Sequence, residues 1–424
     1  MYLQILEEHR PVVVFYRLIE LTDDETGKGL FTSLLNKIQE DGLEDKFKTN
    51  LAGYASDGAS VMTGQQKGLI AVLKDYFKIN VFAVHCMSHR LHLVTGKALD
   101  KKPFFNEFEK DINSVYNFYN QHGHKRKAHL RRIASEMSEA LYTISYIYKV
   151  RWISSELTAL IRLQKSWKIL IIDLKEISAD TKSFNLKTRT KADEILKFLC
   201  GKNFMILLHY FMDLMHIFSH YSKIFQTKDG LLIGKEDMRL NILKSLEEIK
   251  SKDGSYFAEF LKDTKCNGFP CKTSDNYYSC DVTFMNIKLT IDDLPKLMEI
   301  RNDISDSIRE QLNNYFPVDS LKNFNVLNPQ QFPVEESLIP EYGELEIGSL
   351  AKVLNVDVPS AISEWNTLKH IIYHHTKKCA YLQSSSDVFW RFFLKQPEVA
   401  ALKTLSSLIK KVLVLPIGSS EAER

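Results

Sequence analysis

The fold is decided by residues 51–99, which read LAGYASDGASVMTGQQKGLIAVLKDYFKINVFAVHCMSHRLHLVTGKAL. Two short apolar runs, Leu51–Ala55 and Val81–Val84, predict buried strands. A helical pattern follows each run, at Gly68–Phe77 and at Met87–Leu99. Short buried strands that alternate with helices indicate an α/β layer structure.

Polar residues follow both predicted strands, where ligands and metals collect in such sheets. Asp57 and Gly58 come after the first strand, and His85 and Cys86 after the second. Because hard cations prefer oxygen ligands, Asp57 could hold magnesium or manganese. The alternative is that Asp57 caps the next helix or stabilises the turn, since Asp-Gly is a common turn dipeptide.

Three features of this stretch resemble the core of hAT-superfamily DNA transposases and of the host proteins derived from them. They are, in this order, SDGASVMTG, a Gly-Leu helix and HCMSHRLHL. The resemblance implies that Asp57 is the second carboxylate of an RNase H-like Asp-Asp-Glu site. It also implies that Cys86 and His89 form the family's Cys-x-x-His signature. We expect both to pack against the strand that carries Asp57 and to support the site. A zinc site that adds His85 and His92 is the less favoured alternative, because structural zinc usually recruits ligands from two separated knuckles.

The third carboxylate of the family is the Glu of a Glu-Arg pair, which is matched by Glu423 and Arg424. The first carboxylate lies on an earlier strand that has no match in this sequence, and Asp23 and Asp24 are not assigned its role. Two-metal phosphoryl transfer needs convergent carboxylates to hold two hard cations. We therefore expect Asp57 and Glu423 to be vestigial, with no cofactor; magnesium or manganese would bind them only in an active enzyme.

The resemblance implies an α/β RNase H-like core that is interrupted by a large all-α insertion, so that the chain is mostly helical. We expect a partial core without its first strand at 1–100 and the helical insertion at 101–330. The C-terminal hAT dimerisation region, at 331–424, would return to the core. The boundary near Pro329 falls in a segment rich in Asn, Gln and Pro.

Two further elements are expected before the central stretch. Pro11–Leu21 is rich in β-branched and aromatic residues and predicts a strand that lies beside residues 50–57 and 81–85. Thr26–Asp41 predicts an amphipathic helix that Gly42 ends.

The strongest basic cluster is HGHKRKAHLRR, residues 122–132, whose cations could contact phosphates or form a nuclear import signal. The alternative of equal weight is a solvated helix face. The candidate DNA-binding residues in it are Lys125, Arg126, Lys127, Arg131 and Arg132.

Arg151 and Trp152 resemble the Arg-Trp motif that opens the family's helical insertion. The resemblance implies that Trp152 stacks on a flipped base while Arg151 pairs with phosphate. The alternative is a core Trp beside an Arg in a salt bridge.

Composition limits the possible partners. The net charge of +3 means that nucleic-acid binding would depend on local patches, and no apolar run predicts a membrane span. Six scattered cysteines indicate reduced thiols in the cytosol or nucleus. CNGFPCKTSDNYYSC, residues 266–280, is expected to be a loop or helix connection.

Three functional hypotheses remain. The first is a catalytically inactive nuclear protein derived from a hAT transposase, which binds DNA and nuclear proteins and forms a homodimer through its C-terminal region. The second is a fragment of an active transposase with metal-dependent DNA strand cleavage and transfer. The third is a SUMO-ligase-like adaptor derived from such a transposase.

Overall fold

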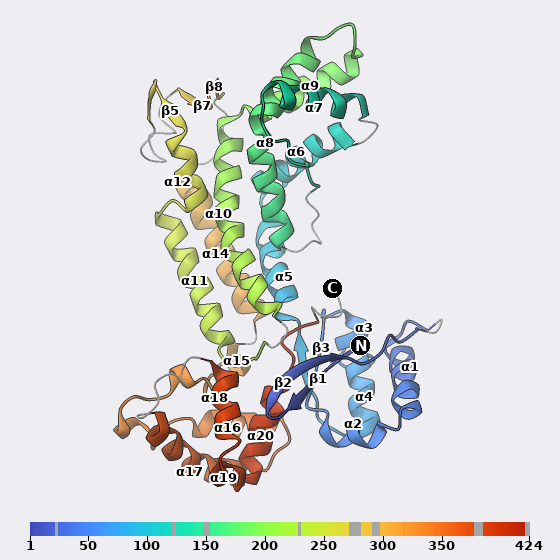
Figure 1. Ribbon diagram of the computed structural model, residues 1–424, viewed down its shortest axis with the longest axis vertical. Coiled ribbons are helices and arrows are strands. Elements are labelled where there is room, and N and C mark those ends of the chain that lie inside the picture. The colour runs from blue at the N-terminus through green and yellow to red at the C-terminus, as the bar shows by residue number, and fades with distance from the viewer. Residues whose placement is uncertain are drawn as a thin grey trace. The chain divides into compact units, whose positions relative to one another are not determined.

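The computed structural model is mostly helical, as the sequence predicts, and its strands form only small sheets (Figure 1). The described residues are 1–21, 24–120, 124–146, 153–227, 230–270, 281–290, 297–316, 318–376 and 385–419. Within these ranges, none of the helices combines the length and the apolar sequence that a membrane span requires.

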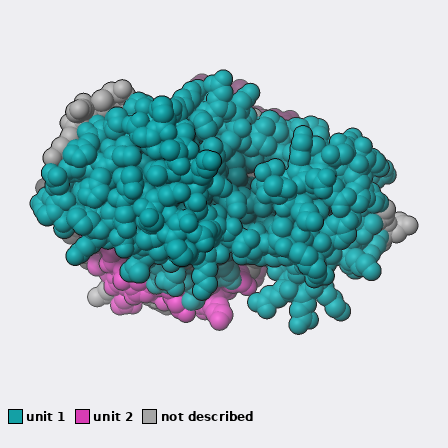
Figure 2. All heavy atoms as spheres, turned by 90° about the horizontal axis from the view of Figure 1, so that it is seen from below, with its two compact units in different colours: residues 1–91, 223–240, 313–424 teal, residues 92–222, 241–312 magenta. Residues whose placement is uncertain are grey.

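The chain divides into two compact units, which Figure 2 shows in two colours. The first unit contains residues 1–91, 223–240 and 313–424, and the second contains residues 92–222 and 241–312. Residues 223–240 and 313–330, which fall inside the insertion predicted at 101–330, belong to the first unit, and residues 92–100 belong to the second.

The first unit begins with an antiparallel hairpin of β1 (Tyr2–Glu7) and β2 (Arg10–Phe15). Its two-residue turn is Glu8-His9, with φ of 47° and 65°. Positive φ at both turn residues matches the right-handed twist of the flanking strands. The predicted strand Pro11–Leu21 is therefore shorter than expected, and its partner β1 is not apparent from the sequence, because the turn lacks the usual Asn-Gly or Asp-Gly.

The helix predicted at Thr26–Asp41 is confirmed as α1 (Gly27–Glu40). The Thr26 hydroxyl accepts a hydrogen bond from the Gly29 N–H at 3.3 Å, and Gly42 follows the helix with φ of 66°. With α4 (Leu69–Phe77), α1 builds an apolar core cluster; α2 (Glu44–Asn50) lies between them in the chain. The buried members of the cluster are Phe31, Leu34, Ile38, Leu69, Leu73, Phe77 and Val81.

The two predicted central strands are confirmed as β3 (Gly53–Ser56) and β4 (Phe82–His85), which pair in parallel. The short helix α3 (Ser60–Thr63) and α4 form the crossover between them. The expectation that residues 11–21 would be their hydrogen-bonded neighbour is wrong for the described residues. The strand β2 pairs with β1, and the two strand pairs are separate sheets.

The C-terminal part of the first unit is helical. Its elements are α15 (Val318–Asn325), η1 (Pro329–Gln331), η2 (Glu336–Leu338), α16 (Glu344–Val353), α17 (Val358–Thr376), α18 (Ser386–Phe393), α19 (Pro397–Ala400) and α20 (Lys403–Leu413). The Trp390 indole N–H donates to the Leu327 carbonyl at 2.8 Å, which ties α18 to the end of α15. The apolar side chains of α20 are fully buried.

The second unit consists mainly of helices and a small four-stranded sheet. Its own helices are α6 (Pro103–Asn120), α7 (His124–Glu136), α8 (Ile153–Ala179), α9 (Leu186–Leu199) and α12 (Ser255–Lys262). Its strands are β5 (Thr264–Cys266), β6 (Phe269–Pro270), β7 (Val282–Phe284) and β8 (Ile287–Lys288). Of the connection predicted at 266–280, residues 271–280 lie outside the described residues, and β6 lies in the described part. Helices with residues in both units are α5 (Met87–Leu99), α10 (Lys202–Phe225), α11 (Lys235–Ser251) and α14 (Leu297–Tyr315).

Candidate functional site

Asp57 lies just past the carboxyl end of β3 and is exposed. Its Oδ1 accepts a hydrogen bond from the Ala59 N–H at 3.0 Å, so the carboxylate stabilises the turn that leads into α3. This is the turn role that the sequence left open beside the metal role. This hydrogen bond uses one carboxylate oxygen, so the other oxygen of Asp57 can still bind a cation or accept a hydrogen bond.

Gly58 is fixed by its backbone and by its neighbour. Its φ is 84°, and a Cβ atom at this position would lie 2.5 Å from both Cε1 and Nε2 of His85. Only glycine combines this backbone conformation with so close an approach of an imidazole ring. The turn after β3 and the end of β4 are therefore packed directly on each other.

His85 is a neutral imidazole at this junction. Burial lowers its pKa to about 4, and the nearby charges of Arg90 and His89 add to the effect. Its Nε2 is buried and has no hydrogen-bond partner among the described residues. Arg90 Nε donates to the His85 carbonyl at 3.2 Å, and the His89 ring centroid lies 5.3 Å from that of His85.

Cys86 connects the strand pair to the C-terminal segment. Its N–H donates to the Ser56 carbonyl at 2.8 Å, which extends the β3–β4 ladder. A Cβ atom on Gly418 would lie 2.7 Å from the Cys86 Sγ, and the Met87 N–H donates to the Ile417 carbonyl at 3.0 Å. The structure thus places Cys86 behind the turn of Asp57 and brings residues 417–418 to the same place.

The described residues supply one carboxylate of the predicted acidic site, Asp57. Among them, no three His, Cys, Asp or Glu side chains gather in a group that could hold a metal ion. Glu423, the other predicted carboxylate, lies outside the described residues, as do Arg151 and Trp152. The sequence-based roles of these three residues stay predictions.

The predicted basic cluster forms α7, in the second unit, and three of its five cations have intramolecular contacts. Lys125 donates to the Ser183 carbonyl and lies over the Phe184 ring. Arg126 lies 4.6 Å from the centroid of the Phe118 ring. Arg132 is paired with Glu136 at 2.7 Å and with Glu176.

The other two cations of α7 remain available. Arg131 is exposed and Lys127 is partly exposed. Within the described part of the chain, neither side chain forms an ion pair. Any phosphate contact by α7 therefore falls mainly on Lys127 and Arg131.

A buried polar network lies behind α7 and was not predicted. Asp173 on α8 accepts hydrogen bonds from the Tyr119 hydroxyl at 2.6 Å and lies 2.7 Å from Nδ1 of His129. The other nitrogen of His129 lies 3.0 Å from the Arg132 guanidinium. The sequence signal was weak because Tyr119, His129 and Asp173 come from three separate helices.

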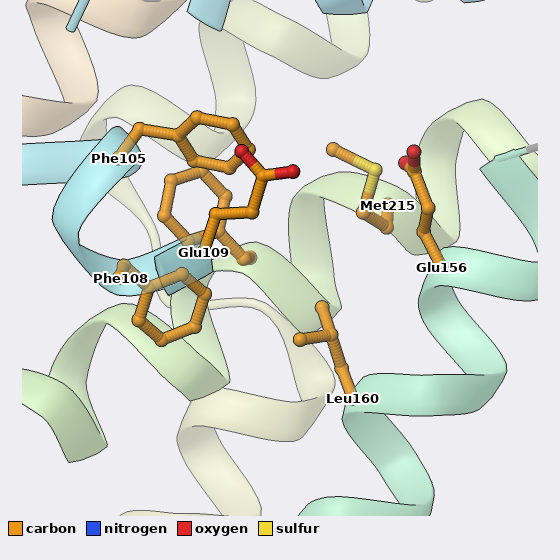
Figure 3. Close-up of a pocket in the computed structure, with 7 residues that line it drawn as sticks. Phe105, Phe108, Glu109, Glu156, Leu160 and Met215 are labelled. Atoms are coloured by element: carbon orange, nitrogen blue, oxygen red, sulfur yellow. The ribbon is translucent and has the colours of Figure 1, made fainter. Parts of the chain in front are cut away.

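A small cavity of about 30 Å³ lies between α6, α8 and α10 (Figure 3). Its lining is apolar except for two carboxylates, Glu109 and Glu156. Burial and the negative charge of Glu109 raise the pKa of Glu156 to about 8. A cavity of this size holds about one water molecule.

A comparison of the sequence with protein-family models found no match.

Proposed function

We propose that this chain derives from a hAT-type transposase and acts in the nucleus by binding DNA and proteins, without cleaving DNA. One observation carries the proposal. The two stretches on which the resemblance depends meet in the first unit, since Met87 is hydrogen-bonded to Ile417 and Gly418 lies against Cys86. Glu423 follows soon after Gly418 in the chain.

The local topology supports an RNase H-like core as part of this proposal. A parallel strand pair carries Asp57 at its carboxyl end, and an antiparallel hairpin precedes it in the same unit. Polar groups at the carboxyl ends of parallel strands are where such sheets hold ligands. The second unit, which is mainly helical, supports the helical insertion that the resemblance implies.

The absence of cleavage is proposed from the sequence. Two-metal chemistry needs several convergent carboxylates, and Asp57 is the one carboxylate of the predicted site among the described residues. In addition, the Asp57 carboxylate accepts the hydrogen bond from the Ala59 N–H that stabilises the turn. The remaining activity is then binding, in which Lys127 and Arg131 of α7 supply positive charge for DNA and the first unit supplies surfaces for proteins and for a second copy.

Manganese binding by the purified chain tests the proposal. We expect weak binding, measured by electron paramagnetic resonance of free manganese, that changes little in Asp57→Asn. The matched control is Asp45→Asn, which removes another exposed acid, on α2. Tight binding that Asp57→Asn abolishes and Asp45→Asn leaves intact would instead favour an active metal-dependent nuclease site.

A further inference from the structure

The segment 332–346, in the C-terminal part of the first unit, carries three large apolar side chains that face solvent. Val334 and Leu345 are each 84% exposed, and Leu338 is 55% exposed. A single exposed apolar residue is ordinary on a protein surface. Three of them on one short segment mark a surface that can bind a partner.

The backbone of segment 332–346 is held in place by buried anchors. The side chains of Phe332 and Ile339 are buried in the first unit. The Trp365 indole N–H donates to the Tyr342 carbonyl at 2.8 Å, and the Tyr342 hydroxyl donates to the Val326 carbonyl at 3.1 Å. An anchored backbone loses little conformational freedom on binding. The exposed apolar side chains are therefore presented on a preformed surface.

Contacts with α17 bring two parts of this segment to one place. The helices α16 and α17 pack against each other (Figure 1). The Tyr373 hydroxyl donates to Glu336 at 3.5 Å, and the Lys369 Nζ lies 3.4 Å from Oε1 of Glu344. Lys369 and Tyr373 are four residues apart on α17, which sets them about 6 Å apart along the helix axis. The helix η2 and the first turn of α16 therefore lie against the same stretch of α17. The two exposed leucines of the segment belong to these two elements.

The segment is also strongly acidic. It has no lysine or arginine, and its five glutamates are Glu335, Glu336, Glu341, Glu344 and Glu346. Glu344 and Glu346 lie in the first turn of α16, where their negative charge suits the helix dipole. Glu335 and Glu341 are exposed and lie outside that helix, and neither forms an ion pair within the described ranges. The contacts of the fold thus leave the charge of these two residues uncompensated.

Charge selects the class of partner for this surface. The phosphates of nucleic acids and the head groups of anionic lipids are repelled by the glutamates. A polypeptide with lysine or arginine side chains is attracted by them, and its apolar side chains can remove the exposed valine and leucines from water. The combination of acidic and apolar side chains therefore fits a basic, amphipathic polypeptide.

We propose that segment 332–346 docks a basic, amphipathic segment of another protein. The apolar side chains of that partner cover the exposed valine and leucines, and its cations lie over Glu335 and Glu341. The inference assigns a surface and a partner class to the protein-binding part of the proposed function. It does not depend on DNA binding by α7, so Lys127→Ala/Arg131→Ala should bind such a partner as the unmodified chain does.

A second copy of this chain is a poorer partner. Two copies of segment 332–346 that met in a symmetric dimer would bring like charges together. The basic helix α7 of a second copy offers positive charge, but residues 124–136 include no exposed large apolar side chain. Neither arrangement satisfies both the acidic and the apolar side chains of the surface.

The probe is a fluorescein-labelled peptide, Lys-Leu-Leu-Lys-Lys-Leu-Leu-Lys-Lys-Leu-Leu-Lys amide, whose leucines fall on one face of a helix. It is titrated with the full chain and followed by fluorescence anisotropy. One control peptide has Glu in place of every Lys, and a second has Ser in place of every Leu. We expect saturable binding of the first peptide alone, with slower hydrogen exchange in segment 332–346 when it is bound.

Leu345→Ser tests the apolar part of the surface. Its matched control is Leu18→Ser, which changes a leucine that is also 84% exposed but lies outside the segment. Because the partner covers only the first of these leucines, we expect Leu345→Ser to weaken binding at least about fivefold and Leu18→Ser less than about twofold. Both side chains are exposed, so both variants should fold.

Glu335→Gln/Glu341→Gln tests the acidic part. The control Glu20→Gln/Glu25→Gln removes two other exposed glutamates and so gives the chain the same net charge. We expect the first variant to weaken binding about tenfold at low ionic strength and the control less than about twofold. The difference should shrink in about 0.5 M salt, because exposed charges are then screened.

Several results would overturn the proposal. These are no saturable binding of the basic amphipathic peptide, equal binding of the Ser-containing peptide, and equal losses in Leu345→Ser and Leu18→Ser. Exchange protection that lies only outside segment 332–346 would also overturn it. A dimer of the chain that Leu345→Ser dissociates and that the peptide displaces would assign the segment to a second copy instead.

Discussion

Gly418 lies against the sulfur of Cys86, at a position where any side chain would collide with it. A Cβ atom on Gly418 would be 2.7 Å from the Cys86 Sγ but 3.7 Å from its Cβ, which is an ordinary contact distance. Cys86 is fully buried, so its sulfur cannot move aside into solvent. The C-terminal segment therefore reaches the end of the β3–β4 pair only because residue 418 is glycine.

Gly418→Ala should lower the free energy of unfolding by about 1–3 kcal/mol, because it overpacks a rigid contact. Urea denaturation followed by circular dichroism measures the change. The double variant Cys86→Ala/Gly418→Ala removes the sulfur and should be more stable than the sum of the two single changes predicts. Gly96→Ala is the matched control, since nothing lies within 4 Å of its added Cβ and the helix should tolerate it. An additive double variant would show that the two residues are not in contact.

The buried His209 of α10 should make the free energy of unfolding sensitive to acid. It is buried and stacked on Phe260 with ring centroids 4.0 Å apart, and burial lowers its pKa to about 4. The unfolded chain takes up a proton near pH 6.5 and the folded chain only near pH 4. The contribution of His209 to the free energy of unfolding is therefore complete above pH 6.5. It is lost as the pH drops toward 4, by about 3 kcal/mol in total.

His209→Phe keeps the stacked ring and removes the titration, so it should flatten the pH dependence of the free energy of unfolding between pH 6.5 and 4. His216→Gln changes an exposed histidine of the same helix and should keep the slope of the unmodified chain. His85, whose pKa burial also lowers to about 4, continues to contribute in both variants. Equal slopes in His209→Phe and His216→Gln would contradict the prediction.

Local signals made the helices and central strands predictable. Thr26 and Gly42 mark the ends of α1, and the apolar runs around residues 54 and 83 mark β3 and β4. The hairpin was only half recognised, because Glu8-His9 forms its turn with positive φ at two residues that carry side chains. Such a turn is decided by the pairing of the flanking strands, which a local pattern does not report.

The candidate site was less predictable than the fold, because its contacts are long-range. The approach of Gly418 to Cys86 joins distant parts of the chain. The basic run around residue 130 likewise gives no sign that Arg132 meets Glu176 or that Lys125 lies over Phe184. Charge along a sequence shows how many cations are present, and only the packing of helices shows which of them are already paired.

DNA binding, if the proposed function holds, should depend on the two unpaired cations of α7. Lys127→Ala/Arg131→Ala should weaken binding to a duplex and reduce the slope of log K against log salt by about 2, because each cation contributes about one phosphate contact. Fluorescence anisotropy over a series of salt concentrations measures both. Arg132→Gln is the control, since its charge is already compensated by Glu136 and Glu176. A larger effect of Arg132→Gln than of the double variant would contradict this assignment.

We expect the main role of the apolar face of α20 to be in stabilising the fold of the first unit, and not in self-association. Leu408 is fully buried within the first unit, although the sequence placed the dimerisation region there. Leu408→Ala should lower the free energy of unfolding by about 2–5 kcal/mol through loss of apolar contact and a residual cavity. Lys403→Ala, at an exposed position of the same helix, should change it by less than about 0.5 kcal/mol. Light scattering over a range of protein concentrations separates the two roles. If Leu408→Ala keeps the stability of the chain but abolishes a dimer, this face of α20 lies at a subunit interface. If a homodimer survives Leu408→Ala, it must use another surface of the chain.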